Sequence, residues 1–344
     1  MPLHRLARHK CLPFSRGSIR MASTVVGKSG RVYVQGEMLR RRQDERNTFK
    51  AESGNEIFLL KHVPRPYFRL CSQWFPLAFA NTHRLRLHID SSANDEERVL
   101  VYPYFQGTLL DVIDENLSDA NRKTILRHVA EAIQELHSRD WIHLDIKPQN
   151  ILVNWTCDSN GTKTITDVAL GDFWHAWFLG TQNPRESQYP IGSVKWRSPE
   201  AHVGKAMTKA SDMYSFGLLC IYVLGYGDAL GPEYDEETFK SDTQLEMRAL
   251  ADTTTLHFGY FGPVAEGFLE QVDDEKCQWA RAFKTSSNRA DYLVKVVPEM
   301  RFEVWGTDVS PEAQDMILGV TKSDPAARLT IGQVLAHPWW QGGE

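Results

Sequence analysis

The chain has 344 residues, of which 42% are hydrophobic and 24% charged, and its formal net charge is −5 at pH 7. This composition is typical of a globular chain with a sizeable core in one large or two modest domains, and it excludes disordered, collagen-like and solenoid chains. The negative charge gives no overall basis for binding nucleic acid, and the longest apolar run, Phe216–Tyr226, is too short for the ~20 residues of a membrane-spanning helix.

The N-terminal segment differs in composition from the rest. Residues 1–36 carry seven Lys and Arg and no acid, which leaves 32 Lys and Arg against 44 Asp and Glu in the remaining chain. An Arg-rich, acid-free leader is typical of a mitochondrial transit peptide, although Pro13 would interrupt a helix there. A disordered basic tail, or a start at Met21, explains the same residues. We predict a basic leader over residues 1–27 and a cytoplasmic or nuclear protein, with a mitochondrial location as the alternative.

Strands are predicted for most of the next part of the chain. Apolar residues alternate over Arg31–Gln35, and a turn at Ser53-Gly54-Asn55 precedes a second apolar segment at Glu56–Val63. A further apolar strand, Val99–Tyr104, ends at Gln106-Gly107. The pattern therefore predicts a small, mainly β lobe over residues 28–105.

From residue 106 the pattern is mainly helical. Ile125, Leu126, Val129, Ala130 and Ile133 recur at helical spacing and mark one buried helix face. Short strands follow, and helical patterns then dominate to the C-terminus. They include the segment from Ser211, Pro311–Val320 and Ile331–His337. The pattern predicts a larger, mainly α lobe over residues 106–344.

The strongest chemical signal lies in the loop between the first of these helices and the strand that follows it. Asp145, Lys147 and Asn150 stand close together there. A carboxylate that orients a hydroxyl, a cation for phosphate charge and an oxygen ligand for Mg²⁺ are the groups that phosphoryl transfer needs. A solvated polar loop is the alternative. The segment resembles the protein-kinase catalytic loop H-R-D-x-K-x-x-N, with Leu144 in place of the Arg.

Other landmarks of that family follow in the same order. The D-F-G motif is resembled by Leu170–Phe173, and the A-P-E motif by Trp196–Glu200. The start of the central helix of the large lobe is resembled by Ser211–Gly217, and the closing segment by Asp324–Trp340. The resemblance implies that Asp212 braces the catalytic loop through backbone N–H groups. It also implies that Arg328 is the buried partner of Glu200.

These motifs identify the chain as a member of the eukaryotic-type protein kinase family, and Lys147 marks the serine/threonine type. The sequence looks closest to kinase-domain proteins of filamentous fungi. The resemblance implies an α+β, bilobal kinase domain over residues 28–344, with ATP and Mg²⁺ as cofactors and an unknown protein as substrate. Asp145 would orient the hydroxyl and accept its proton, Lys147 would neutralise the transferring charge, and Asn150 with Asp172 would hold Mg²⁺.

The nucleotide-binding lobe matches the family less well. Lys61 corresponds to the V-A-I-K lysine, but Gly36 is the only glycine where a glycine-rich loop is expected, and no acid stands between His62 and Ile89 to pair with Lys61. By alignment with the family's hinge strand, Pro103 and the backbone of Phe105 would face the adenine. The candidate base-binding residues are Phe105 and its neighbour Tyr104.

Two further departures from the family pattern affect the D-F-G segment, which carries Asp172, and the activation segment, which the A-P-E motif closes. Trp174 replaces the glycine of D-F-G, which should restrict the backbone there. Leu144 cannot receive an activation-loop phosphate, so we expect activity to be independent of phosphorylation within Trp174–Lys195.

Three functions are consistent with the sequence. The first is an active serine/threonine kinase. The second is a pseudokinase that serves as a nucleotide-binding or protein-binding scaffold, favoured by the weak nucleotide lobe. The third, a small-molecule phosphotransferase, is disfavoured by Lys147, Ser198-Pro199-Glu200 and Arg328, which belong to a protein-substrate platform.

Overall fold

The computed structural model describes residues 23–40, 47–94, 96–180, 184–232, 243–271, 277–305 and 309–341. The chain divides into two compact units, each of which is described by itself. The smaller comprises Met1–Pro64 and Ile89–Tyr102, and the larger comprises Arg65–His88 and Pro103–Glu344. Arg65–His88 thus belongs to the larger unit, whereas the sequence pattern assigns all of residues 28–105 to the small lobe.

The smaller unit is built on a sheet with the strand order β1-β2-β3-β4-β6-β5. In that order, the strands span Thr24–Val26, Val32–Arg40, Thr48–Ser53, Glu56–His62, Val99–Pro103 and Asp90–Ser91. The predicted turn at Ser53-Gly54-Asn55 is confirmed, because Ser53 pairs with Glu56 and Gly54 has a φ of 61°. Two-residue hairpin turns require positive φ, which glycine adopts readily.

The core of the smaller unit follows from the alternation of side chains along its strands. In β3 and β4, Phe49 lies opposite Leu60, and Ala51 lies opposite Phe58. These four side chains are buried on one face of the sheet, where they form a cluster with Val25, Tyr33, Val99 and Val101. The alternate residues of β3 and β4, including Lys61, lie on the other face.

Aromatic packing joins Arg65–His88 to the larger unit. This segment forms α1 (Arg65–Arg69), the π-helix η1 (Leu70–Trp74) and α2 (Phe75–Ala78). The Phe75 ring lies 5.0 Å from the Trp141 ring and 5.1 Å from the Phe173 ring, in edge-to-face geometry. Such contacts stabilise beyond their buried area, so the apolar side of the segment packs on the larger unit, as its sequence alone did not indicate.

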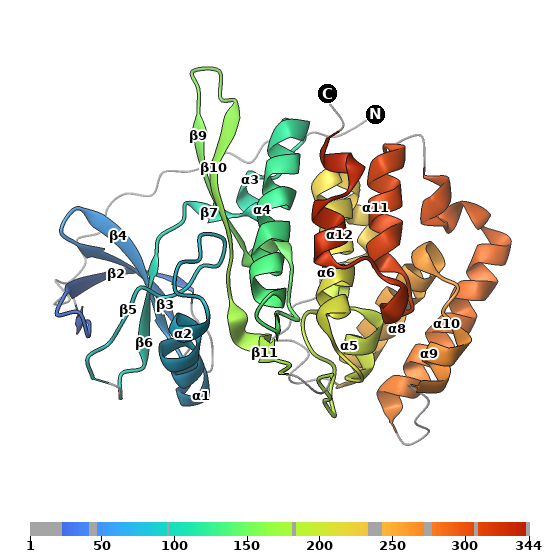
Figure 1. Ribbon diagram of the computed structural model, residues 1–344, viewed down its shortest axis with the longest axis horizontal. Helices are drawn as coiled ribbons and strands as arrows, with labels where there is room; N and C mark the ends of the chain where they lie inside the picture. The colour runs from blue at the N-terminus through green and yellow to red at the C-terminus, as the bar shows by residue number, and fades with distance from the viewer. Residues whose placement is uncertain are drawn as a thin grey trace, which may run out of the picture. The chain divides into compact units, whose positions relative to one another are not determined.

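After Pro103 the larger unit continues with α3 (Leu109–Val112) and the long helix α4 (Asp119–His137). The side chains predicted to form a buried face, Ile125, Leu126, Val129, Ala130 and Ile133, are all buried in α4. A three-stranded sheet, β10-β9-β7, lies against this helix, and Figure 1 shows β9 and β10 as a long hairpin beside α4. These strands span Lys163–Leu170, Ile151–Cys157 and Gly107–Thr108.

The most buried long helix described in the larger unit is α6 (Lys209–Ile221), in which every residue from Ser211 to Ile221 is buried. Figure 1 shows α4 and α11 on either side of it, and both helices contact it. The other α-helices are α5 (Pro199–Val203), α8 (Thr243–Phe261), α9 (Glu266–Gln271), α10 (Gln278–Val296), α11 (Pro311–Thr321) and α12 (Ile331–Leu335). Together the two units give the α+β composition that the sequence predicts.

One helical stretch among the described residues, Lys209–Leu230, is long and apolar enough to cross a membrane by length and composition. Its most apolar window is 61% buried inside the larger unit. The buried core helix of a soluble protein has the same length and apolar composition, so this stretch is only weak support for a membrane span.

Candidate functional site

The candidate catalytic loop runs from β8 (Trp141–Ile142) to the short 3-10 helix η2 (Pro148–Asn150). The fully buried carboxylate of Asp212 accepts hydrogen bonds from the backbone N–H groups of His143 and Leu144, both at 2.8 Å. His137 Nε2 lies 3.0 Å from the same carboxylate. The predicted brace is therefore confirmed, and it fixes the loop on the first turn of α6.

The His143 imidazole joins this loop to the segment that carries Asp172. Its Nδ1 accepts from the backbone N–H of Asp145 at 3.2 Å, and its Nε2 lies 3.1 Å from the carbonyl oxygen of Gly171. Because a backbone N–H can only donate and a carbonyl can only accept, the neutral ring carries its proton on Nε2. The ring is fully buried, so this bridge is shielded from water.

The three predicted side chains of the loop do converge. Lys147 Nζ lies 3.1 Å from Asp145 Oδ2. Asn150 Nδ2 donates to the same oxygen at 3.0 Å and to the Asp145 carbonyl at 2.7 Å. These contacts hold the Asp145 carboxylate, which is 8% exposed, in one orientation.

Ser193, which lies within the segment Trp174–Lys195, also contacts Asp145. Its hydroxyl donates to Asp145 Oδ1 at 2.7 Å, its backbone N–H donates to the same oxygen at 3.0 Å, and Lys147 Nζ donates to the hydroxyl. The signal in the sequence is the preceding Gly192, with a φ of 84°. A Cβ at Gly192 would lie 2.2 Å from the Leu144 carbonyl oxygen, so only glycine permits this approach.

Asn150 and Asp172 are close through the backbone, because the N–H of Gly171 donates to the Asn150 carbonyl at 2.9 Å. Asp172 itself adopts a left-handed conformation with φ 61° and ψ 68°. A carboxylate and an amide oxygen are hard ligands that suit Mg²⁺, which proteins commonly bind with one or two such groups together with substrate phosphates. The pair fits this ion in the chemistry of its donors. No group of three or more His, Cys, Asp or Glu side chains suited to a metal occurs in the described part of the chain.

Trp174 replaces glycine without demanding an unusual backbone. It lies in the 3-10 helix η3 (Phe173–His175), and the left-handed conformation falls on Asp172 instead. Its ring lies 5.0 Å from that of Tyr67 in α1, while Phe173 is buried against Phe75 and His143. These ring contacts anchor the segment that follows Asp172.

The candidate base-binding residues Tyr104 and Phe105 follow β6 and are half-buried. Next to them, the carbonyl oxygen of Pro103 accepts hydrogen bonds from Arg86 Nε at 3.1 Å and from Arg86 Nη2 at 2.8 Å. The Arg86 guanidinium lies 5.8 Å from the centre of the Phe105 ring. The carbonyl that was expected to face an adenine therefore already has a partner from the chain itself.

Lys61 and Gly36 lie in the smaller unit. Lys61 is half-buried in β4, opposite Thr48. Gly36 was expected in a loop between two strands, but it lies inside β2, at an irregularity of the pairing with β3. A Cβ there would lie 3.3 Å from the Lys50 carbonyl oxygen, a close approach that suits glycine. Residues 41–46, which include Arg41 and Arg42, lie outside the described residues.

Leu144 is buried in an apolar cluster. It packs with Ile142, Ala201 and Met207, and Leu179 and Ile191 cover the cluster. These residues come from β8 and the catalytic loop, from the segment between Asp172 and Glu200, and from α5 and the stretch that follows it. Apolar burial thus connects the two segments at the position where the family has an arginine.

Glu200 and Arg328 form a buried, two-pronged ion pair, as the resemblance implied. Arg328 Nη1 and Nη2 lie 2.7 and 2.9 Å from the two Glu200 carboxylate oxygens, and the Ser211 hydroxyl donates to one of them at 2.7 Å. Burial would raise the pKa of Glu200, but the charge and hydrogen bonds of Arg328 hold that pKa below its usual value. The pair joins α5 to the segment that precedes α12.

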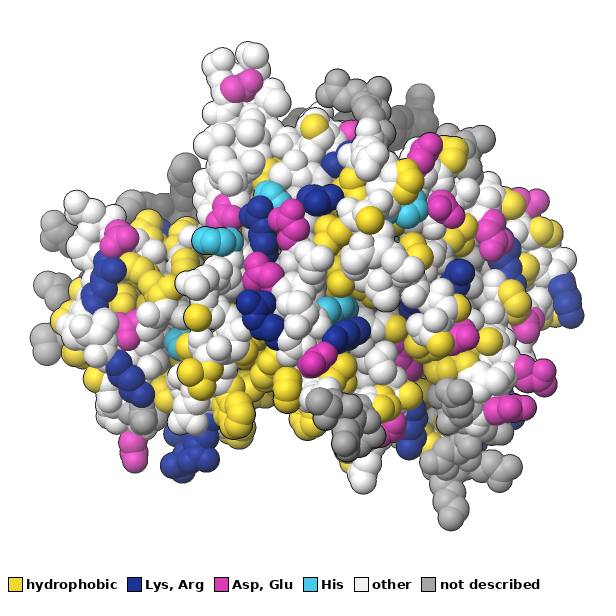
Figure 2. Space-filling view, in the orientation of Figure 1, with side chains coloured by type: hydrophobic (Ala, Val, Ile, Leu, Met, Phe, Trp, Pro, Cys, Tyr) yellow, Lys and Arg dark blue, Asp and Glu magenta, His cyan; other side chains and the backbone are white. Residues whose placement is uncertain are grey.

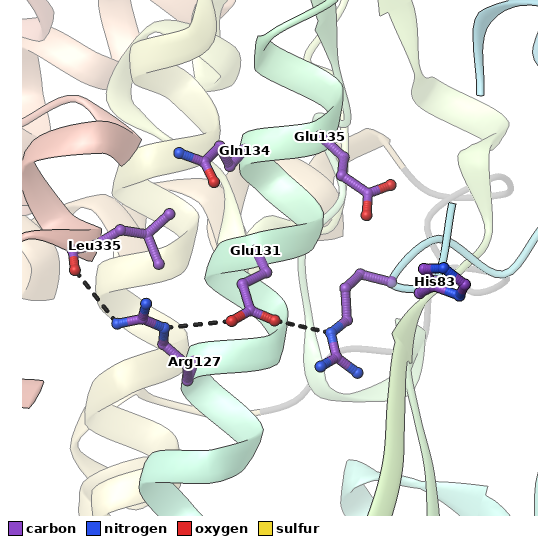
Figure 3. Close-up of a pocket in the computed structure, with 7 residues that line it drawn as sticks. His83, Arg127, Glu131, Gln134, Glu135 and Leu335 are labelled. Carbon is purple, nitrogen blue, oxygen red and sulfur yellow. Dashed lines mark hydrogen bonds and ion pairs between the residues drawn. The ribbon is translucent and has the colours of Figure 1, made fainter. Parts of the chain in front are cut away.

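A polar pocket of about 650 Å³ lies apart from these residues, on the face of α4. Figure 3 shows Glu131 at its centre, with Arg127 directed toward both Glu131 and the Leu335 carbonyl. Arg84 Nε donates to Glu131 at 2.8 Å from another side. The pocket thus joins residues of both charges, and Figure 2 shows basic and acidic side chains side by side on the same face of the molecule.

A family model described as protein kinase domain matches residues 78–340 of the chain. A probable serine/threonine-protein kinase of Dictyostelium discoideum is 36% identical over 126 residues, which are 36% of this chain and 7% of that protein. A probable cyclin-dependent kinase 8 of the same organism is 25% identical over 74% of this chain and 64% of its own length.

A calcium/calmodulin-dependent protein kinase of Emericella nidulans is 28% identical over 69% of this chain and 43% of its own length. The chain thus spans less than two thirds of the length of each of these three relatives. Among solved structures, a chain of the yeast RNA Pol II CTD kinase complex matches with a TM-score of 0.64 and 14% identity, over 96% of this chain and 98% of that chain. At this identity the match concerns the fold alone.

Proposed function

The chain belongs to the protein kinase family, and we propose that it transfers the γ-phosphoryl group of ATP to a hydroxyl group of a protein, with Mg²⁺. The proposal rests above all on one observation, the orientation of the Asp145 carboxylate by Lys147, Asn150 and Ser193 within a loop fixed by Asp212. A scaffold that performs no chemistry has no physical need for this constellation.

The residues around Asp145 take complementary roles in this proposal. Asp145 would orient the substrate hydroxyl and accept its proton as the new P–O bond forms. Lys147, whose ammonium already faces this carboxylate, would neutralise charge on the phosphoryl group in flight. Asn150 and Asp172 would hold Mg²⁺, which screens the phosphate charge, and Lys61 in the smaller unit would bind nucleotide phosphates.

Transfer of radiolabelled phosphate tests the proposal. The purified chain is incubated with labelled ATP and Mg²⁺, and label is counted in the chain itself and in casein and histone as added substrates. We expect incorporation by the native chain, at least 100-fold less by Asp145→Asn because its general base is lost, and normal incorporation by the control Asp167→Asn, a half-exposed acid of β10. Equal incorporation by Asp145→Asn and the native chain would contradict the assignment of Asp145.

A second experiment addresses the nucleotide and the metal. At a hundredfold excess over its Kd, a ligand that binds only the folded state stabilises it by about 2.7 kcal/mol. We expect ATP with Mg²⁺ to raise the melting temperature. The increase should be smaller when EDTA is added and in the variant Asp172→Asn.

A pseudokinase scaffold is the second candidate function. One observation favours it, namely that the carbonyl of Pro103 is engaged by Arg86. Absence of both phosphate incorporation and an ATP-dependent shift in the native chain would support this alternative.

A further inference from the structure

Arg86 occupies a defined place between the segment after β6 and the end of β10. Its backbone N–H donates to the Leu170 carbonyl at 2.8 Å, so the residue is anchored beside β10. Its side chain passes close to Gly171, where a Cβ would lie 3.6 Å from Arg86 Cβ and 3.3 Å from Leu152 Cδ1. It ends with two hydrogen bonds to the Pro103 carbonyl.

This place coincides with the expected position of a nucleotide base. The resemblance puts Pro103 and the backbone of Phe105 against the adenine, whose exocyclic amino group needs a carbonyl acceptor. In the structure the Pro103 carbonyl accepts two N–H groups of one guanidinium, and the Phe105 ring lies beside that guanidinium. Adenine and the Arg86 guanidinium therefore compete for one acceptor.

We propose that Arg86 closes the base-binding edge of the nucleotide site and has to leave the Pro103 carbonyl before adenine binds. Arg86 thereby determines how tightly the chain binds an adenine nucleotide. This inference rests on the nucleotide site of the proposed function but not on phosphoryl transfer, because it concerns the base alone.

The chemistry of the contact gives the direction and size of the effect. A guanidinium bound to a carbonyl through two N–H groups is a charge-assisted interaction, stronger than the single neutral hydrogen bond that an adenine amino group offers in its place. A site that is open only part of the time binds its ligand more weakly in proportion to the open fraction. We therefore expect Arg86 to weaken adenine binding by about tenfold to a hundredfold.

Adenosine binding to the full chain, measured by titration calorimetry without Mg²⁺, tests the inference. Adenosine reports on the base edge because it carries no phosphate for Lys61 or the metal ligands. The test variant is Arg86→Met, which keeps the length and apolar stem of the side chain but removes its donors. The matched control is Arg84→Met, two residues earlier, where the half-buried arginine pairs with Glu131 instead.

We expect Arg86→Met to bind adenosine at least about tenfold more tightly than the native chain, and Arg84→Met to bind it as the native chain does. If Arg86→Met bound adenosine as tightly as the native chain or more weakly, the inference would be overturned and Arg86 would have a structural role only. Equal gains in both variants would overturn it as well, because the effect would then come from general loosening. Unfolding midpoints establish that the variants are folded.

A second variant protects the test if Arg86→Met does not fold. Arg86→Lys keeps the charge but donates from one atom only, so we expect a smaller gain in adenosine affinity, and no gain would again overturn the inference. The outcome is independent of the proposed reaction: a gain in adenosine binding without phosphate incorporation would retain the role of Arg86 and reject phosphoryl transfer. Phosphate incorporation with no gain in adenosine binding would retain phosphoryl transfer and reject the role of Arg86.

Discussion

The carboxylate of Asp212 accepts the backbone N–H of Leu144 at 2.8 Å, across 68 positions of the sequence. The same carboxylate accepts the N–H of His143, so one buried side chain satisfies two successive backbone donors. Buried backbone donors that lack a partner destabilise a fold, and the Asp212 side chain lies in a helix whose residues are buried all round. This pair therefore sets the position of the loop that carries Asp145.

Replacing Asp212 tests this relationship. Asp212→Asn keeps the shape of the side chain but turns one acceptor oxygen into a donor, which would face a backbone N–H. We expect a loss of about 1–3 kcal/mol in the free energy of unfolding, measured by urea denaturation, and slower phosphate transfer. The control Asp140→Asn changes a half-exposed acid paired with Lys209 and should alter stability by less than about 0.5 kcal/mol. Equal stability of Asp212→Asn and the native chain would refute the bracing role.

The ion pair of Glu200 and Arg328 gives a second prediction. Arg328→Met leaves the Glu200 carboxylate buried without its cation, and we expect a loss of about 3–5 kcal/mol in the free energy of unfolding. The double variant Glu200→Gln/Arg328→Met removes the uncompensated charge and should recover part of this loss. If the double variant were less stable than Arg328→Met, the loss would have to come from packing and not from the buried charge. Thermal and urea unfolding of the three proteins provide the comparison.

The cluster around Leu144 predicts that activity does not require phosphorylation of the neighbouring segment. Leu144 is connected by apolar packing to Ala201 and Met207, so no phosphate is needed to join these parts. The variant Ser187→Ala/Tyr189→Phe should therefore retain the native rate of phosphate transfer. Ser193 stays unchanged in this test because its hydroxyl contacts Asp145. Abolished transfer in a folded double variant would show that a phosphate is required after all.

Two buried histidines predict loss of stability in acid. Burial, together with the charge of Lys195, lowers the pKa of His257 to about 3, and burial lowers the pKa of His202 well below its usual value. The unfolded chain binds a proton at each site near pH 6.5 while the folded chain does not, so the free energy of unfolding falls as the pH drops from 6.5 toward 3. For His257 the loss at pH 5 is about 2 kcal/mol relative to neutral pH.

Urea denaturation from pH 7 to pH 4 checks this prediction with His257→Phe. Phenylalanine suits the site because the His257 ring lies among Tyr214 and Phe261. We expect a flatter dependence of stability on pH than in the native chain. The control His83→Phe, at an exposed position beside the pocket of Figure 3, should keep the native slope. An unchanged slope in His257→Phe would exclude this histidine as a source of acid sensitivity.

The sequence by itself determined the elements and the chemical groups of this protein. The hairpin turn at Gly54 and the buried face of α4 follow from rules that act within a few residues, namely turn chemistry and helical periodicity. The ordered motifs further implied the contacts of Asp212 with the catalytic loop and of Glu200 with Arg328, and both contacts are present.

The tertiary structure decided the other contacts between distant segments. The packing of Arg65–His88 on the larger unit and the hydrogen bonds of Arg86 to Pro103 have no periodic or local signal in the sequence. The contact of Ser193 with Asp145 is marked in the sequence by Gly192 alone. Each arises because a buried ring or hydroxyl, or the half-buried Arg86 guanidinium, satisfies its packing or hydrogen-bond requirements with whatever partner the fold brings near. That partner is fixed by the three-dimensional arrangement of segments far apart in the chain.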